Sequence, residues 1–427
     1  MQKLVTLLQK MWRTRALRNK LLFTAGVFLL FRLLAHIPLP GVDLAQLQSI
    51  FQNNQFLNLL NIFSGGTLSN FSIVAVGINP YITASIIMQL ATMVFPKLKE
   101  IQKEGETGRE RINQYTRLIA VPLAIIQSVS VLTLLRSQQL IAINNPLLLV
   151  ALISTLVAGA MVVMWLGELV SLYGIGNGIS MILLGGILSR LPVTFAELFT
   201  AGTGDQAMTA IIVITLLTVI IALIVFMNES VRKIGIQYAK RQRGSRVYGN
   251  YMTHLPIRVN VSGVMPIIFA LSVMIAPSFI GRLMVASQQA QLVAVGQKLQ
   301  IWFAQTNPVF IITYFLVVFF FSFFSALIFF NAEDLSSELK KSGAFLPGVR
   351  PGAATKKYLE FVVNRITLIG AVFLGFVAVL PSLVQNATGI QSLALGGTSA
   401  LIVVSVILET AKQVESMLVE QNYDQYR

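Results

Sequence analysis

The residue types that usually carry out chemistry in proteins are scarce in this sequence. It has no cysteine and only two histidines, His36 and His254, and no carboxylates are spaced with them as zinc ligands would be. No serine stands in a nucleophile motif of the hydrolase kind. The sequence therefore predicts no catalytic residue, no metal site, no cofactor and no enzymatic activity.

One glycine-rich run, residues 174–178 (GIGNG), superficially resembles a phosphate-binding turn. Such a turn follows a strand, and no strand pattern precedes this run. Glycine adopts positive φ freely, so a tight turn between two helices is the favoured interpretation. Nucleotide binding is the alternative.

Ionisable residues inside apolar segments mark ion and solute pathways in membrane proteins, and this chain nearly lacks them. Arg32 lies in the first apolar segment with His36 close by, and both positions fit a membrane interface. Glu168 and Glu409 fall at the ends of apolar segments. No chain of ionisable groups crosses the apolar segments, which counts against a secondary transporter coupled to protons or sodium.

The elements that must position these residues are long apolar helices. Hydrophobic residues make up 55% of the 427 residues, charged residues make up 11%, and the mean hydropathy is +0.74. A soluble chain carries about 25% charged residues, and a helix needs about 20 apolar residues to cross a bilayer. The sequence predicts ten spans, at residues 20–38, 73–95, 118–136, 147–167, 178–196, 209–227, 263–281, 308–331, 366–385 and 391–410.

Basic residues sort to one side of the membrane if these spans alternate in direction. They gather before the first span and after the second, sixth and eighth spans. Basic loops remain in the cytoplasm. We therefore predict a multi-pass protein of the plasma (inner) membrane with both termini cytoplasmic, and the thylakoid membrane is the alternative location.

Residues 56–71 (FLNLLNIFSGGTLSNF) are apolar but too short to cross a bilayer, and SGGT interrupts them. One interpretation is an amphipathic helix that lies on the outer membrane surface. The other is a half-helix folded into the protein, because irregular backbone at membrane depth is tolerated only when it is buried or lines a cavity. The residues alone leave both interpretations open.

Two predicted cytoplasmic loops, at about 228–262 and 332–365, are too long to be simple connectors. The first contains the basic run at 236–246 (IQYAKRQRGSR). Such a hairpin could bind RNA phosphates or an acidic protein surface. The alternative is attraction to anionic lipid headgroups together with control of topology.

Several motifs of this sequence resemble segments of the SecY family, in the same order and at similar spacing. They are residues 77–90 (GINPYITASIIMQL), 174–180 (GIGNGIS), 237–241 (QYAKR), 340–352 (KKSGAFLPGVRPG) and 396–399 (GGTS). The resemblance therefore covers essentially the whole chain.

The resemblance implies an all-α polytopic membrane fold. Ten transmembrane helices would form two pseudo-symmetric five-helix halves, residues 1–196 and 197–427, with a short plug half-helix at about 57–70. The implied function is a protein-conducting channel that translocates signal-bearing unfolded polypeptides and releases transmembrane segments laterally into lipid. A membrane scaffold that recruits cytosolic partners through basic loops is a rival hypothesis, beside the secondary transporter.

In that family a ring of bulky apolar side chains pinches the channel at mid-membrane. Motif matching assigns the ring to Ile78, Ile82, Ile179, Leu183, Ile268 and Ile402. Leu183 departs from the commoner isoleucine and keeps its size and apolarity. A narrow apolar constriction resists ions by dewetting.

The resemblance also implies a plug and a lateral gate. The plug residues would be Leu60, Phe63, Ser64, Gly65, Gly66 and Leu68. The gate would lie between the second and third spans and the seventh and eighth, with Thr83, Gln127 and Ser272 as candidates. Polar pairs there would contribute only about 0.6 kcal/mol each, weak enough to open when an apolar signal helix competes.

The partners that the resemblance implies are cytosolic and membrane proteins. The SecA ATPase or the ribosome would bind the two long loops through Lys240, Arg241, Arg243, Arg246 and Arg350. SecE and SecG would be membrane partners, with YidC as a further candidate. Signal peptides, nascent chains and membrane lipids complete the set.

Overall fold

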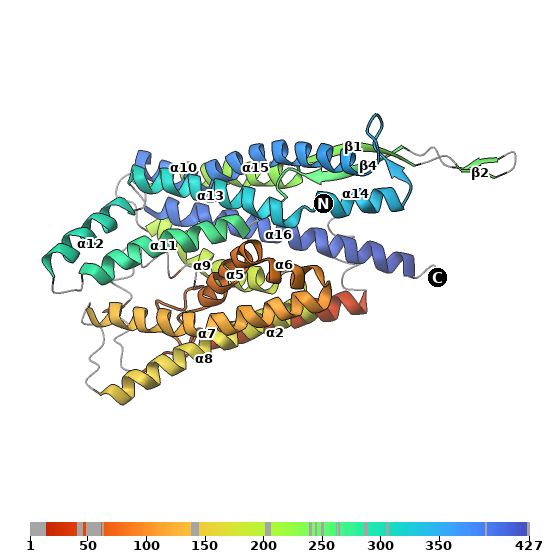
Figure 1. The fold of residues 1–427 in the computed structure, drawn as a ribbon. Coiled ribbons are helices and arrows are strands. Elements are labelled where there is room, and N and C mark those ends of the chain that lie inside the picture. Colours follow the sequence, from red (N-terminus) through yellow and green to blue (C-terminus); the bar gives the residue numbers. More distant parts are fainter. Residues whose placement is uncertain are drawn as a thin grey trace.

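Long helices that run side by side dominate the computed structural model of the chain (Figure 1). The structure describes residues 14–40, 46–47, 61, 64–137, 145–200, 206–238, 241–243, 246–248, 252–261, 263, 265–285, 289–304, 307–388 and 391–424. The helices are α2 (Arg15–Leu34), α5 (Asn79–Val94), α6 (Pro96–Lys103), α7 (Glu106–Ser137), α8 (Pro146–Tyr173), α9 (Gly178–Thr200), α10 (Gln206–Glu229), α11 (Met265–Val285), α12 (Ala290–Trp302), α13 (Pro308–Phe329), α14 (Ala332–Lys341), α15 (Ala353–Thr388) and α16 (Gln391–Asp424).

Each of the ten predicted spans overlaps one of the long helices. By length and composition, the described residues contain four helical stretches able to cross a membrane, namely Glu106–Thr133, Pro146–Tyr173, Pro308–Lys341 and Ala353–Asn386. The bent pair α5 and α6 makes a fifth when taken as one span, and three further helices are apolar but shorter. The multi-pass prediction is confirmed, and the count of ten remains a prediction.

The second predicted span differs from the structure at both of its ends. Residues 73–78 are turns rather than helix, and α5 begins only at Asn79, after Gly77 with φ 62°. At the other end, α5 and α6 meet at 102° around Phe95. Pro96 explains this bend, because proline disfavours the helical conformation of the residue before it, and Phe95 is extended.

The two long basic loops contain strands that the all-α prediction did not include. β1 (Val231–Tyr238) pairs antiparallel with β4 (Met252–Arg258) and with β5 (Ala344–Phe345), in the order β4-β1-β5. Beyond them, β2 (Arg241–Arg243) pairs with β3 (Arg246–Tyr248) and extends far from the helices (Figure 1). The fold is predominantly helical, as predicted, with this small sheet added.

The sheet joins the two loops into one unit, which we call the basic module (residues 231–258 and 332–352, as far as the structure describes them). Ile234 and Ile236 alternate with exposed or half-buried neighbours along β1, so one face of the strand is apolar. That face packs with Leu339 of α14 and Leu359 of α15 in a core of its own. Segments about a hundred residues apart in sequence therefore share one sheet and one core.

The helices contact one another in two groups. α2, α5, α7, α8 and α9 contact each other, and so do α10, α11, α13, α15 and α16. Between the groups, contacts are made by α5 with α11, by α9 with α16 and by α9 with α10. In Figure 1, α7 and α8 lie on one side of the molecule, with α13 and α15 on the other.

Close packing of α8 against the turns before α5 depends on Gly159. A Cβ at this position would lie 2.0 Å from the carbonyl oxygen of Ile73, so a side chain requires the backbone to shift. We expect Gly159→Ala to destabilise the purified protein by about 1–3 kcal/mol, measured as a lower melting temperature.

A matched control is Gly26→Ala in α2, where a Cβ would meet nothing within 4 Å. This change should leave the stability unaltered or raise it slightly, because alanine favours helix over glycine. Equal melting temperatures for the two variants would contradict the importance of the Gly159 contact.

Candidate functional site

The largest apolar cluster of the molecule contains the predicted ring residues. Ile78, Ile82, Leu183, Ile268 and Ile402 are buried members of this cluster, each at most 4% exposed. Ile179 is partly buried and packs against it. The structure therefore brings together residues of α5, α9, α11 and α16, which come from both groups of helices.

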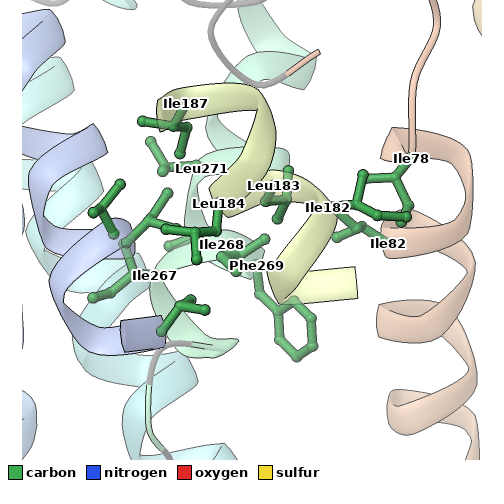
Figure 2. Packing of buried hydrophobic residues seen from close by; sticks show 14 of the residues in the cluster. Ile78, Ile82, Ile182, Leu183, Leu184, Ile187, Ile267, Ile268, Phe269 and Leu271 are labelled. Carbon is green, nitrogen blue, oxygen red and sulfur yellow. The ribbon is translucent and has the colours of Figure 1, made fainter. Parts of the chain in front are cut away.

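Helical spacing explains how these side chains reach one place. Ile179 and Leu183 are four residues apart in α9, so they project from one helix face. Ile78 is the N-cap residue of α5, and Ile82 lies in its first turn. In Figure 2, Leu183 and Ile182 of α9 lie between Ile82 of α5 and Ile268 of α11. The six predicted ring residues have only apolar side chains. Such a surface offers an ion no replacement for its hydration shell.

Ile78 has a second set of neighbours that motif matching did not anticipate. A Cβ on Gly167 of α8 would lie 3.3 Å from Ile182 Cδ1 and 3.6 Å from Ile78 Cδ1. The ends of these two side chains therefore pack over the glycine of α8. Ile78 therefore packs both in the ring cluster and against α8.

The GIGNG run forms the turn between α8 and α9, so the tight-turn prediction is confirmed. Gly176 has φ 82°. The N–H of Ile175 donates to Thr24 Oγ1 at 3.2 Å, and the N–H of Gly178 donates to Ser171 Oγ at 2.9 Å. These backbone donors are already used within the protein, which removes the basis of the nucleotide-binding alternative.

The interrupted apolar segment is mostly buried where the structure describes it, with Ser69 and Asn70 partly exposed. Residues 64–68 are all buried, and residues 64–70 form hydrogen-bonded turns. This burial favours a segment folded into the protein over a helix on the membrane surface. Of the predicted plug residues, Leu60 and Phe63 lie outside the described residues, and Ser64, Gly65, Gly66 and Leu68 lie in these turns.

Several polar groups of this segment bond within it, whereas Asn61 Nδ2 has no hydrogen-bond partner among the described residues. Ser64 Oγ donates to the carbonyl of Asn61 at 3.0 Å, and the N–H of Leu68 donates to Ser64 Oγ at 3.2 Å. The N–H of Ser69 donates to Asn61 Oδ1 at 2.9 Å. Gly65 and Gly66, with φ 73° and 82°, allow the sharp reversal.

The segment touches α9 through a contact between two glycines. A Cβ on Gly65 would lie 2.8 Å from Gly186 Cα, and a Cβ on Gly186 would lie 2.5 Å from Gly65 Cα. Gly186 is three residues after Leu183, hence on the same helix face one turn along. The buried turns therefore lie directly beside the apolar ring. Sequence reasoning missed Gly186, for which the Gly185-Gly186 pair was the available signal.

The three predicted gate residues do not bond to one another. Thr83 Oγ1 donates to the carbonyl of Asn79, and Ser272 Oγ donates to the carbonyl of Ile268, both at 3.0 Å within their own helices. Gln127 is partly buried, and its side chain has no hydrogen-bond partner among the described residues. Contact between α5 and α11 is therefore not held by hydrogen bonds of these residues.

The predicted docking residues lie in the basic module. Arg350 is exposed, and its carbonyl accepts from Thr355 Oγ1 at 2.9 Å, which fixes the loop backbone. Arg241, Arg243 and Arg246 lie in β2 and β3, with Arg243 paired to Arg246. Lys240 lies outside the described residues.

Comparison with known proteins identifies the family. The family model described as SecY matches residues 72–411, which is most of the chain. The chain belongs to the SecY family. A relative, the protein translocase subunit SecY of Mycobacterium bovis, is 40% identical over 435 residues, covering 96% of this chain and 97% of its own.

Solved structures share the fold of this SecY-family chain. A structure described as that of a protein conducting channel matches with a TM-score of 0.63 at 18% identity, covering 93% of this chain and 92% of the other. Sec61 in the canine ribosome–channel complex from the endoplasmic reticulum matches with a TM-score of 0.57 at 16% identity, with the same coverage.

The glycine contact beside the ring makes a specific prediction. Because the chain has no cysteine, a single thiol introduced by Thr67→Cys, at a fully buried position, reports on the seating of residues 64–70. We expect Gly186→Ala in this background to raise the rate of thiol labelling at least about tenfold, the factor that about 1.4 kcal/mol of lost packing gives.

Gly185→Ala is the control, since its Cβ would meet only the Phe28 ring, at 3.2 Å, and a side chain can yield. Labelling should change little in that variant. Equal labelling rates in the Gly186→Ala and Gly185→Ala variants would show that the glycine contact does not hold the segment.

Proposed function

We propose that the chain is the channel-forming subunit that conducts signal-bearing, unfolded polypeptides across a membrane and releases transmembrane segments laterally into lipid. The main support is the apolar cluster that brings together the predicted ring residues of α5, α9, α11 and α16, with a buried turn segment beside it. A constriction of flexible apolar side chains resists ions by dewetting and can part around a polypeptide.

The proposal assigns roles to the two groups of helices. We infer that residues 1–196 and 197–427 are the two halves of a clamshell, which part between α5 and α11. Support comes from the contacts within each group and from the internal hydrogen bonds of Thr83 and Ser272, which leave the gate surfaces free to separate. Residues 57–70 would be the plug that seals the ring.

The energy for transport would come from a cytosolic partner, and the chain itself would do no covalent chemistry. We infer that SecA or the ribosome binds the basic module through Arg350 and the hairpin residues Lys240, Arg241, Arg243 and Arg246. The canine Sec61 structure is a ribosome complex, which supports a ribosome partner. SecE and SecG would be partners within the membrane, with YidC as a further one.

The proposed location is the plasma (inner) membrane, with both termini in the cytoplasm and the thylakoid membrane as the alternative. The concentration of basic residues on one predicted side supports this orientation. It places the basic module in the cytoplasm, where its proposed partners are.

Reconstitution tests the function directly. The chain is placed in vesicles with SecE, and SecA, ATP and a signal-bearing preprotein are added outside. ATP-dependent protection of the preprotein from protease is the expected result. With folding and SecE binding verified, a lack of protection would overturn the channel proposal in favour of a scaffold that only recruits partners.

Arg350 offers a test of the proposed docking surface. We expect Arg350→Glu to lower the rate of SecA-driven transport about tenfold, since about 1.4 kcal/mol of lost binding gives that factor. Its side chain is exposed, so the melting temperature should not change.

Lys298→Glu is the control for the change of charge. Lys298 is exposed on α12, which lies at the end of the molecule opposite the sheet (Figure 1). This variant should transport normally. Normal transport by Arg350→Glu as well would contradict the docking role.

A further inference from the structure

The base of the β1–β4 hairpin is closed by a bond between two asparagine side chains. Asn228 lies in the last turn of α10, and Asn260 follows β4. Asn260 Nδ2 donates to Asn228 Oδ1 at 2.8 Å, and beside them the N–H of Val259 donates to the carbonyl of Ser230 at 3.0 Å. The two chain segments that enter and leave the hairpin are thus joined where they reach the helices.

This base is bonded to α16 at two points. Asn228 Nδ2 donates to Ser405 Oγ at 3.1 Å. Lys412 Nζ lies 3.2 Å from the carbonyl oxygen of Asn228 and 2.8 Å from Glu229 Oε1. Ser405 and Lys412 are seven residues apart, so they lie on the same face of α16, two turns from each other. The hairpin base is therefore fixed along α16 and not only at one point.

The same bonds reach two helices that carry ring residues. Ser405 is three residues after Ile402, so it lies one turn further along the same face of α16. Asn260 Nδ2 also donates to the carbonyl of Gly263 at 3.1 Å, two residues before α11 begins, and α11 carries Ile268. One amide group thus contacts the hairpin base, the start of α11 and, through Asn228, α16.

On its other side, the hairpin base is pressed against α15. A Cβ on Gly370 would lie 2.8 Å from the carbonyl oxygen of Val259. Packed protein is nearly incompressible. A displacement of the hairpin therefore moves its base with it, because the base is clamped between α15 and α16.

A cavity of about 250 Å³, lined by polar and apolar side chains, gives the bonded groups room to rearrange. It is lined by Asn228, Asn260, Ser405 and Lys412 together with Asn177 and Ser180 of the other group of helices. Asn260 is 8% exposed, and its Oδ1 is buried without a hydrogen-bond partner among the described residues. An unsatisfied buried acceptor is unfavourable, so an arrangement that gives it a donor competes with the one observed.

We propose that the Asn228–Asn260 pair, with Ser405, couples the basic module to the apolar ring, so that a partner bound to the module shifts α16 and α11. These are positioning residues, and the inference rests on the proposed channel function. The Asn228–Asn260 pair lies at the base of the hairpin, whereas the proposed docking surface is the distant exposed part of the module. Breaking the pair therefore separates partner binding from channel opening.

The test uses reconstituted vesicles with SecE, SecA, ATP and a signal-bearing preprotein. Asn260→Asp keeps the shape of the side chain but removes both of its donated hydrogen bonds. We expect the maximal translocation rate to fall at least about fivefold, which is the smallest effect that coupling between two sites usually has. The SecA concentration for half-maximal rate should stay unchanged, which distinguishes lost coupling from a disordered docking surface.

Further variants keep the proposal testable. Ser405→Ala removes the bond from Asn228 to α16 and leaves the Lys412 contacts in place. It should also lower the maximal rate, which keeps the proposal testable even if Asn260→Asp fails to fold. In Asn228→Asp, the new carboxylate still accepts from Asn260 and can accept from the Ser405 hydroxyl. The maximal rate should therefore fall less in this variant than in the other two. Asn307→Asp at the start of α13, where the side chain caps the helix by accepting from Val309 N–H, is the control and should have no effect.

Two outcomes would overturn the coupling. One is an unchanged maximal rate in both Asn260→Asp and Ser405→Ala. The other is a rise in the half-saturating SecA concentration with the maximal rate intact, which would make the pair part of the docking surface. No ATP-dependent translocation by the unsubstituted chain would instead overturn the proposed function, and the coupling with it.

Discussion

A bilayer offers no water to satisfy backbone polar groups, and this constraint governs the irregular segments that are packed among the apolar helices. The turns at 64–78 and 174–177 break helices within the packed protein, so their polar groups must find partners inside it. Ser64 and Asn61 supply them in the first case, and Thr24 and Ser171 supply them in the second. Glycines then let these turns approach neighbouring helices closely enough to remain buried.

Apolar contact between the two groups of helices follows from the same constraint. A hydrogen bond between α5 and α11 would have to break whenever the helices part, and its polar groups would then be left unsatisfied. The hydroxyls of Thr83 and Ser272 instead bond to carbonyls of their own helices. In the proposed opening between α5 and α11, those bonds would persist, and the Thr83 and Ser272 hydroxyls would not be left without a partner.

Sequence reasoning recovered what depends on composition and local pattern. Apolar length located the helices, and the resemblance to the SecY family assigned the ring residues, which the structure gathers in one apolar cluster. It did not show the start of α5, because the apolar character of residues 73–78 hides their turns. It also missed Gly186 and the Asn228–Asn260 pair, since such contacts join residues far apart in the chain. A single asparagine in a loop looks the same whether or not it has a distant partner.

The small sheet shows how a helical membrane protein can carry an ordered surface beyond its helices. Each basic loop alone would be a flexible connector, because neither buries enough apolar area to order itself. Pairing β5 with β1 lets Ile234, Ile236 and Leu359 share one core, which fixes the backbone that presents Arg350. In the proposed coupling, a displacement of β1 and β4 reaches the hairpin base, where the hydrogen bonds of Asn228 and Asn260 and the cavity beside them can rearrange.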